Sequence, residues 1–307
     1  MDLYDLIIIG GGPAGITASI YASRKKLKTL LITKDFAGQV ELSWNIENYP
    51  GFPQITGHNL MENLKKHLQE YEIEIKKFEE VKKIIKEENK LKVITNENEY
   101  TSLSLIIATG AFLKKLNIKN EEKFIGHGIS YCLTCDERSF EGKTVAVIGG
   151  GNAGAEAALE LKTFCPKIYI LEYLDQLNCD EILKEKVLSS SSIEVVTGAE
   201  ILSFEGNEEL EKIMFKNRKT KEEKEILING CFVEIGTKPN TEFLEGLVDL
   251  NERKEIIVDP KTMVTSVKGI FAAGDICNFN HKQIIMACGQ GALAALSAYK
   301  YLKTNFK

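Results

Sequence analysis

The chain has 307 residues, a length that suits two domains better than one. Its hydrophobic fraction of 44% is enough for a globular core, and its net charge of −5, with no basic stripe, argues against a nucleic-acid partner. No apolar run approaches the roughly 20 residues that cross a bilayer. Asp2 and Asp5 stand where a signal peptide would carry basic residues, so we expect a cytoplasmic protein with no membrane partner.

The first expected element is a buried parallel strand over Leu6 to Ile9, because this short apolar run ends in Gly10. A helix over Ile16 to Lys26 and a second strand over Thr29 to Thr33 follow it. In the turn between strand and helix, the glycines permit a tight bend, close approach of a pyrophosphate, and packing of the helix on the strand. The segment therefore predicts a dinucleotide site at Gly10, Gly12, Pro13, Ala14 and Gly15.

The acid that usually binds the ribose of the dinucleotide is missing from this first unit. Thr33 sits 21 residues after Gly12, where an Asp or Glu is usual. Thr33 or Asp35 takes that role, or the ribose is held elsewhere. Two turn-rich stretches follow, and they contain Gln39 and Asn48. These amides are surface-loop residues unless a flavin ring lies beside them, in which case they are its edge partners.

The stretch that follows is expected to complete the first unit. His58 to Glu70 has the pattern of an amphipathic helix. Ile73 to Ile85 and Leu91 to Thr95 alternate like the strands of a small antiparallel sheet. Leu105 to Ala108 is typical of a buried strand, and it closes on Gly110.

The pattern then restarts with a second strand–turn–helix–strand unit. We expect a strand over Thr144 to Ile148, a helix that ends near Phe164, and a strand over Lys167 to Leu171. Glu172 falls 21 residues after Gly151, where a ribose-binding acid belongs. This unit predicts a second dinucleotide site at Gly149, Gly151, Asn152, Ala153, Gly154 and Glu172.

The rest of the chain is expected to be mostly strands and one long helix. The strands, one pair of which forms a hairpin, cover Ile193 to Phe204, Lys212 to Phe215, Glu225 to Ile228, and Cys231 to Ile235. A last strand ends in Gly274-Asp275. A helix then begins near Lys282-Gln283 and runs through small residues to about Leu302.

A Cys-x-x-Cys pair, Cys132 and Cys135, precedes the second unit and is followed directly by Asp136. In a reducing compartment such a close pair is catalytic or metal-binding. Half of a zinc site is the alternative, but no second pair or His cluster has ligand spacing, and His127 is the only His nearby. The other cysteines are expected to be buried packing residues: Cys165, Cys179, Cys231, Cys277 and Cys288.

These motifs occur in the order found in the low-molecular-weight thioredoxin reductases, which the whole chain resembles. The second half is especially similar to the flavoprotein subunit of bacterial alkyl hydroperoxide reductases. The similar stretches are Gly149 to Gly154, Leu171 to Tyr173, Gly236 to Thr241, and Lys282 to Ile285. That subunit also carries an N-terminal thioredoxin-like domain, so here we expect any such domain to be a separate protein.

The resemblance implies an α/β protein with two Rossmann-like three-layer nucleotide-binding domains, the second inserted into the first. The expected FAD-binding domain covers residues 1–112 and 241–307, and the expected NAD(P)H-binding domain, with the dithiol, covers 113–240. Family members rotate one domain against the other, so that dithiol and nicotinamide take turns at the flavin. Besides the first glycine-rich turn, the FAD contacts are expected at Thr33, Gln39, Asn48, Gly110, Gly274, Asp275, Lys282, Gln283 and Ile284.

The resemblance also implies roles at the dithiol. Cys135 faces the flavin, Cys132 attacks the substrate disulfide, and Asp136 manages the thiol proton. The thiolate is the reactive form of a cysteine, and dithiol exchange passes two electrons to a partner. The expected partners are a thioredoxin- or glutaredoxin-like protein and a second copy of this chain.

The residues after the second strand of the inserted domain bear on the electron donor. Reductases that use NADPH carry arginines there, whereas this chain has Glu172 to Asp175 and no Lys or Arg between Ile168 and Ile182. A ribose 2′-hydroxyl can donate to the Glu172 carboxylate, whereas a 2′-phosphate would meet like charge. NADH is therefore favoured over NADPH. Clostridial ferredoxin-dependent flavin reductases also lack the arginines, but they tend to lose the glycine-rich turn that this chain keeps.

Three functions remain open at this point. The first is an NADH-dependent reductase of thioredoxin or a glutaredoxin-like protein, with a ferredoxin-dependent flavin thioredoxin reductase as its variant. The second is the reductase of a peroxide-removing chain that acts through a small dithiol protein on a peroxiredoxin. The third is a non-enzymatic FAD-binding redox sensor with a vestigial dithiol, and the intact Cys-x-x-Cys-Asp motif argues against it.

Overall fold

The computed structural model of the chain describes residues 3–36, 38–43, 46 and 48–306. The chain divides into two compact units. Unit 1 contains Met1–Glu41, Tyr49–Phe112 and Lys238–Lys307, and unit 2 contains Leu42–Asn48 and Leu113–Thr237. Both ends of the chain therefore belong to unit 1. The predicted α/β fold with parallel sheets is confirmed.

Unit 1 is built on a seven-stranded sheet. Its parallel part places β1 (Leu3–Ile9) between β2 (Thr29–Thr33) and β6 (Glu99–Ile107), and β17 (Ile270–Ala272) also pairs with β6. The second half of β1, Leu6 to Ile9, is apolar and buried, and β2 is buried throughout with an apolar centre, as expected for strands that are covered on both faces. The strand that precedes Gly274 is thus in the same sheet as the strand that precedes Gly10.

The strands predicted after residue 73 do not form a small sheet of their own. β3 (Glu74–Lys77) pairs in parallel with β2. Phe78 then adopts a left-handed backbone conformation, with φ of 63°, which ends β3. β4 (Val81–Lys86) and β5 (Leu91–Thr95) are antiparallel as predicted, but β5 pairs with β6 and so extends the main sheet.

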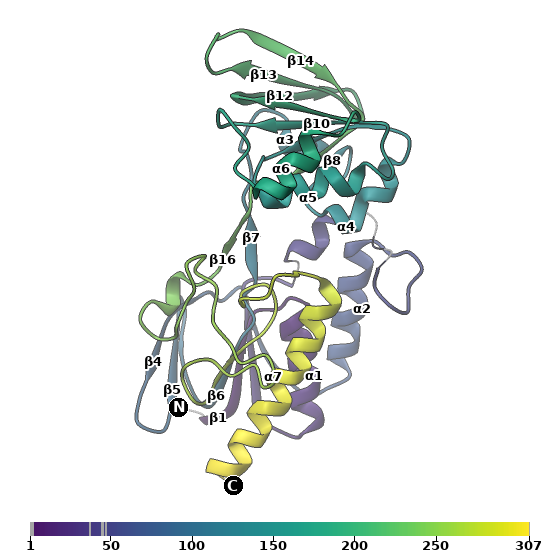
Figure 1. The fold of residues 1–307 in the computed structure, drawn as a ribbon. Helices are drawn as coiled ribbons and strands as arrows, with labels where there is room; N and C mark the ends of the chain where they lie inside the picture. The colour runs from purple at the N-terminus through teal and green to yellow at the C-terminus, as the bar shows by residue number, and fades with distance from the viewer. Residues whose placement is uncertain (1–2, 37, 44–45, 47, 307) are drawn as a thin grey trace. The chain divides into compact units, whose positions relative to one another are not determined.

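Two helices pack on the sheet of unit 1, α1 (Pro13–Arg24) and α7 (Ile284–Asn305), and α2 (Gly57–Gln69) packs on α1. α1 starts three residues earlier than predicted, because Pro13 suits the first helical position. α1 and α7 lie side by side (Figure 1), in contact through small residues: a Cβ on Gly291 would lie 2.1 Å from the carbonyl oxygen of Ala14. Short 3₁₀ helices cover Gln39–Leu42 and Glu242–Leu244.

Unit 2 has three layers, and the middle one is a five-stranded parallel sheet (Figure 1). The strand order is β11 (Ile193–Thr197), β10 (Lys167–Glu172), β9 (Thr144–Ile148), β15 (Gly230–Val233) and β8 (Ile129–Ser130). α5 (Asn152–Leu161) and α6 (Glu181–Leu188) cover one face. A three-stranded antiparallel sheet covers the other, made of β12 (Ala199–Gly206), β13 (Leu210–Asn217) and β14 (Glu223–Leu227).

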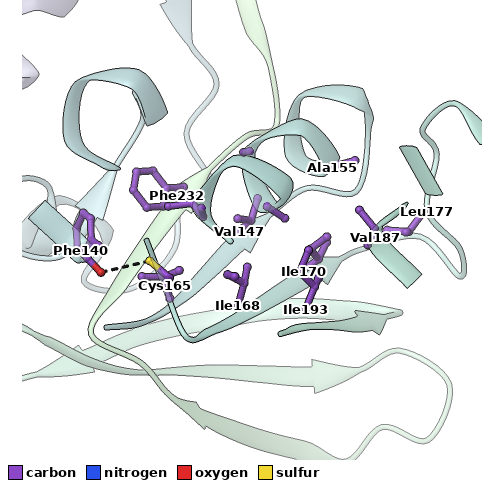
Figure 2. Packing of buried hydrophobic residues seen from close by; sticks show 14 residues of the cluster. Phe140, Val147, Ala155, Cys165, Ile168, Ile170, Leu177, Val187, Ile193 and Phe232 are labelled. Atoms are coloured by element: carbon purple, nitrogen blue, oxygen red, sulfur yellow. Dashed lines mark hydrogen bonds between the residues drawn. The ribbon is translucent and has the colours of Figure 1, made fainter. Parts of the chain in front are cut away.

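The two faces of this sheet have separate hydrophobic cores. On the helical side, Val145 and Val147 of β9 pack with Phe232, Cys165 and their neighbours (Figure 2). On the other side, Ala146 and Ile148 pack against residues of the antiparallel sheet. This alternation along β9 is the period of two expected for a strand buried on both faces.

The single strand predicted over residues 193–204 is two strands in the structure. Gly198 separates β11 from β12 and has a φ of 66°, a conformation that turns the chain from the parallel sheet into the antiparallel one. The predicted hairpin is confirmed as β13 and β14. The connecting segments β7 (Ala111–Leu113) and β16 (Thr237–Pro239) pair with each other. Among the helices of the described chain, none has both the length and the apolar character needed to cross a bilayer.

Candidate functional site

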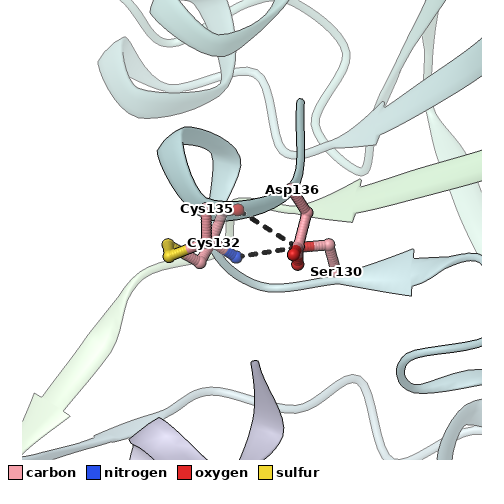
Figure 3. Close-up of a disulfide and its surroundings, with 4 residues drawn as sticks. All are labelled: Ser130, Cys132, Cys135 and Asp136. Atoms are coloured by element: carbon pink, nitrogen blue, oxygen red, sulfur yellow. Dashed lines mark hydrogen bonds between the residues drawn. A yellow bond between two sulfur atoms is a disulfide. The ribbon is translucent and has the colours of Figure 1, made fainter. Parts of the chain in front are cut away.

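Cys132 and Cys135 form a disulfide at the end of β8 (Figure 3). Cys132 is the N-cap of α4 (Leu133–Asp136), and its carbonyl oxygen accepts the amides of Cys135 and Asp136, each at 3.3 Å. This turn brings the two Cα atoms to 5.3 Å from each other, within the range that a disulfide needs. Both cysteines are half-buried, so the pair is within reach of an exchanging thiol.

Ser130 connects the two ends of this turn, and sequence reasoning missed it. Its hydroxyl donates to Asp136 Oδ2 at 2.6 Å and lies 3.2 Å from the carbonyl oxygen of Cys132. The hydroxyl oxygen of Ser130 also accepts a hydrogen bond from the backbone amide of Cys132 at 3.0 Å (Figure 3). Ser130 therefore fixes the Asp136 carboxylate in the turn that contains the disulfide, and the acid–base role expected for Asp136 stays a prediction. The only sequence signal for Ser130 is its position two residues before the first cysteine.

A buried carboxylate anchors the residue just before the disulfide. Glu121 lies in α3 (Glu121–Phe124), is 1% exposed, and accepts the Tyr131 hydroxyl. It also accepts the amides of Leu116 and Asn117 at 2.8 and 2.6 Å. Burial and the bond to Glu121 raise the pKa of Tyr131, so this hydroxyl stays a donor. Glu121 therefore ties Tyr131, the residue before Cys132, to the backbone of Leu116 and Asn117.

The second glycine-rich turn leaves an open face in front of α5. A Cβ on Gly154 would lie 1.9 Å from the carbonyl oxygen of Gly149, which itself has a φ of 118°. At Gly151 the nearest atom to such a Cβ is the carbonyl oxygen of Asn178, at 3.9 Å. The helix begins at Asn152 with no side-chain cap at Gly151, so the backbone amides there are accessible. An open glycine at a helix N-terminus fits a pyrophosphate.

The predicted ribose-binding acid lies at this turn. Glu172 is the last residue of β10 and is 7% exposed. One carboxylate oxygen accepts the amide of Gly150, and the other accepts the amide of Leu174 at 2.6 Å. Each oxygen keeps a lone pair for a further donor. The side-chain amide of Asn152, in contrast, pairs reciprocally with Asp180, donating at 3.1 Å and accepting at 2.8 Å.

Two cations from a distant part of the sequence lie beside the residues that follow this acid. Arg218, at the turn between β13 and β14, donates from Nη1 to the carbonyl oxygen of Tyr173 at 3.0 Å. Its guanidinium carbon lies 4.1 Å from the centre of the Tyr173 ring. Lys219 pairs with Asp175 at 3.3 Å. These cations come from another sheet, so the local sequence around Glu172 could not indicate them.

In unit 1, the first glycine-rich turn has the same construction as the second. A Cβ on Gly10 would lie 2.3 Å from the carbonyl oxygen of Ala108, and one on Gly15 would lie 1.8 Å from that of Gly10. Gly12 has no atom within 4 Å of such a Cβ. The open face lies at the start of α1, where Pro13, Ala14 and Gly15 form the first turn. This cradle fits the pyrophosphate of a dinucleotide such as FAD.

The Gly274-Asp275 pair is brought to this cradle. A Cβ on Gly274, which has a φ of 84°, would lie 3.1 Å from the Ala14 Cβ. The Gly274 amide donates to the side chain of Gln290 in α7 at 2.8 Å, a holding residue that the sequence did not indicate. Burial raises the pKa of Asp275, and Lys282 opposes that rise.

The ammonium group of Lys282 bonds to three other residues of unit 1. Its ammonium pairs with Glu255 at 2.9 Å and donates to the carbonyl oxygens of Asp275, at 3.1 Å, and of Cys277. α7 begins at Ile284, with Gln283 as its N-cap. Gln283 and Ile284, for which flavin contacts are predicted, thus lie at the N-terminus of a long helix.

The remaining predicted FAD contacts differ in their placement. Thr33 is 4% exposed, and its hydroxyl donates to the carbonyl oxygen of Asp35. Gln39 donates to the carbonyl oxygen of Ala111, directly after Gly110. Asn48 belongs to the short segment that groups with unit 2, so it is not in the unit that contains Gln39.

Four of the five other cysteines are buried as predicted, and Cys179 is half-buried instead. Cys165 donates to the carbonyl oxygen of Phe140 at 3.2 Å (Figure 2), and burial raises its pKa to about 11. It is a packing residue rather than a nucleophile. Within the described ranges, no three or more His, Cys, Asp or Glu side chains gather as they would to hold a metal ion.

Comparisons with known proteins add a family and a fold. A sequence model of the pyridine nucleotide-disulphide oxidoreductases matches residues 4–291. The chain is 39% identical over 302 residues to a Bacillus subtilis protein named NADH dehydrogenase, covering 98% of this chain and 59% of that protein. It is 39% identical over 303 residues to an alkyl hydroperoxide reductase subunit of Staphylococcus aureus, covering 98% and 60%. The chain thus spans about three fifths of the length of these relatives.

Among solved structures, thioredoxin reductase from Streptococcus pyogenes is similar along almost its whole length. The TM-score is 0.94 at 32% sequence identity, and the match covers 98% of this chain and 99% of that one. The similarity therefore includes both units and the segment with the disulfide.

Proposed function

The chain belongs to the pyridine nucleotide-disulphide oxidoreductase family, and we propose that it carries electrons from NADH through FAD to a protein disulfide. The thioredoxin-reductase fold and the disulfide-capable cysteine pair make it an oxidoreductase of that general type. The observation that carries the proposal is the half-buried disulfide of Cys132 and Cys135, in a turn where Ser130 also holds the Asp136 carboxylate.

The family implies a flavin and a nicotinamide nucleotide, and each unit offers one cradle. In unit 1 the amides at the start of α1 and the open face of Gly12 would hold the FAD pyrophosphate, beside Gly274 and Asp275. Bound FAD would supply a carrier that takes two electrons from the nicotinamide and gives them to the disulfide. In unit 2 the turn from Gly149 to Gly154 would hold the nicotinamide dinucleotide.

The cysteine pair would pass the electrons on by thiol–disulfide exchange. The Cys132 thiolate attacks one sulfur of the substrate disulfide, forms a mixed disulfide, and releases the other sulfur as a thiolate. The Cys135 thiolate then attacks Cys132, which closes the pair again and releases the second substrate thiolate. Asp136 takes and returns the proton of the thiol that reacts, and Ser130 keeps its carboxylate in place.

The preference for NADH rests on Glu172. A ribose 2′-hydroxyl would donate to a carboxylate that already accepts two backbone amides, whereas a 2′-phosphate would meet its charge. Arg218 and Lys219 lie close to the next residues and lessen that repulsion. We therefore propose NADH as the donor, with a narrower margin over NADPH than Glu172 alone would give.

A thioredoxin- or glutaredoxin-like protein is the proposed electron acceptor, and a homodimer is the proposed assembly, which sedimentation velocity measures directly. The 39% identity to the alkyl hydroperoxide reductase subunit supports a second candidate, the reductase of a peroxide-removing chain. In that case a small dithiol protein would carry electrons from Cys132 to a peroxiredoxin. The two candidates share every step up to the dithiol and differ only in the partner.

Rapid-mixing experiments test the donor and the acceptor separately. The purified protein is first checked for its yellow flavin absorbance and then mixed with NADH, NADPH or reduced ferredoxin. We expect fast bleaching of the flavin by NADH, and steady-state turnover when a thioredoxin- or glutaredoxin-like protein is added. Bleaching by ferredoxin alone would overturn the donor. Bleaching by NADH with no turnover on any protein disulfide would favour a redox sensor.

A further inference from the structure

Tyr173 is an exposed aromatic residue at the point where the second dinucleotide cradle ends. It directly follows Glu172, the last residue of β10, and 54% of its surface is exposed. An exposed tyrosine is ordinary on a protein surface. This one is unusual because a guanidinium from a distant part of the chain holds both its ring and its backbone.

Arg218 makes these two contacts at once. Its guanidinium carbon lies 4.1 Å from the ring centre of Tyr173, and Nη1 donates to the Tyr173 carbonyl oxygen at 3.0 Å. The Arg218 amide donates to the carbonyl oxygen of Gly198 at 2.8 Å, and the Gly198 amide donates to that of Leu174 at 2.8 Å. Arg218 is half-buried, whereas the ring above it stays open. The ring is thus braced on one face and presented on the other.

The position of this ring relative to Glu172 indicates what it meets. In a cradle of this kind the pyrophosphate lies at the helix N-terminus and the acid that ends the second strand holds the adenosine ribose. The adenine, which is joined to that ribose, must then lie beyond the end of β10, where Tyr173 and Leu174 follow. An aromatic ring held rigidly there offers a stacking surface to a base.

We propose that Tyr173 is the surface on which the adenine ring of the dinucleotide stacks, and that Arg218 is the positioning residue that holds it. The proposal rests on the proposed function, since it concerns the nucleotide site of that reaction. It identifies two residues that determine affinity for the adenosine half of NADH. One of them lies in the antiparallel sheet, outside the strand–turn–helix unit that forms the rest of the site.

The test uses fragments of the donor and the whole protein. ADP-ribose contains the adenine half of NADH, and nicotinamide mononucleotide contains the other half. Isothermal titration gives the Kd of each for the parent protein and for Tyr173→Ala, Tyr173→Phe, Arg218→Ala and the control Lys219→Ala. Lys219 is in the same turn, and its ammonium pairs only with the exposed Asp175 among the described contacts, so its loss changes local charge without touching the ring.

We expect Tyr173→Ala to raise the Kd for ADP-ribose by about 10-fold, the loss of one base-stacking contact. Tyr173→Phe should stay within about 2-fold of the parent protein because it keeps the ring, and nicotinamide mononucleotide should bind all variants equally. Arg218→Ala should show the effect of Tyr173→Ala in weaker form. With NADH as substrate, KM should rise while kcat at saturation is unchanged, because the reacting ring is not touched.

The outcomes separate this proposal from the proposed function. If the parent protein is reduced by NADH but Tyr173→Ala binds ADP-ribose as tightly as the parent, the stacking surface is rejected and the reductase stands. An equal loss in Lys219→Ala would also reject it, in favour of a charge effect. If the parent protein binds no ADP-ribose and does not respond to NADH, the proposed donor fails, and this proposal fails with it.

Discussion

Ser130 has one hydroxyl proton, and the 2.6 Å distance to Asp136 indicates that the carboxylate receives it. We expect Ser130→Ala to slow protein-disulfide turnover by about 10-fold, because the hydroxyl that bonds both the Asp136 carboxylate and the Cys132 amide is lost. Reduction of the flavin by NADH should be unchanged. Ser130→Thr, which keeps the hydroxyl, serves as the matched control and should restore most of the activity. Equal turnover in Ser130→Ala and the parent protein would show that Asp136 needs no such support.

Glu234, which lies directly after β15, is a carboxyl group that lowers the stability of the fold when it ionises. Burial raises its pKa to about 7, above the value of about 4.3 expected in an unfolded chain. A raised folded pKa means that its contribution to stability is fully present below pH 4 and is lost as pH rises through 7. Glu234→Gln should therefore be about 1–3 kcal/mol more stable than the parent protein at pH 8 and equally stable at pH 4.5.

Thermal unfolding at several pH values measures this difference. Glu185 is exposed on α6, and Glu185→Gln is the control, for which we expect no change in the pH dependence. A parent protein whose melting temperature does not fall between pH 5 and 8 relative to Glu234→Gln would contradict the raised pKa of Glu234. The two residue-scale predictions are independent, because one concerns turnover and the other concerns folding.

At the scale of elements, the two glycine-rich turns could be predicted from sequence because they are local. Gly10, Gly12 and Gly15 are spaced for one strand, one turn and one helix, and the structure forms them in that order. The placement of Ser130 and Arg218 could not be predicted, because each depends on the pairing of strands distant in sequence. β8 pairs with β15, about 100 residues later, and Arg218 reaches Tyr173 only through the antiparallel sheet.

The glycines of the first turn have different tasks, and this leads to a prediction at the same scale. Gly15→Ala should destabilise the protein by several kcal/mol, because its Cβ would lie 1.8 Å from the Gly10 carbonyl oxygen where α1 packs on β1. Gly12→Ala has open space, and φ of −77° and ψ of −175° suit alanine. It should fold normally but bind FAD about 10-fold or more weakly.

Flavin content after purification and thermal unfolding of the flavin-free protein distinguish the two effects. A folded Gly12→Ala protein with full flavin would mean that FAD does not approach this turn. A stable Gly15→Ala protein would mean that α1 can move away from β1 without cost. The pair of variants thus separates the packing function of the turn from its binding function.

For the whole molecule, the chain order of the two units could be predicted from the repeated motif, but the boundaries of their sheets could not. The segment over Ile73 to Thr95 has the alternation of an independent sheet, yet its strands extend the sheet of unit 1 on both sides. Alternation shows that one face of a strand is covered and does not show which strand it pairs with. Cys179, predicted to be buried, is half-buried for a similar reason: burial depends on the packing of a loop that has no periodic pattern.

The proposed electron path uses the whole molecule, since the FAD cradle lies in unit 1 and the disulfide in unit 2. Cys132→Ser and Cys135→Ser should each reduce protein-disulfide turnover by at least about 1000-fold, because a serine cannot form or cleave a disulfide. Reduction of the flavin by NADH should proceed at the parent rate in both variants, because the hydride reaches the flavin without using either thiol. Cys165→Ser is the control: it removes a buried thiol that bonds only the Phe140 carbonyl oxygen among the described contacts, so turnover should persist. Turnover that survives in Cys132→Ser or Cys135→Ser would remove the pair from the path, and flavin reduction that fails in both would mean that the cysteine pair affects the donor step as well.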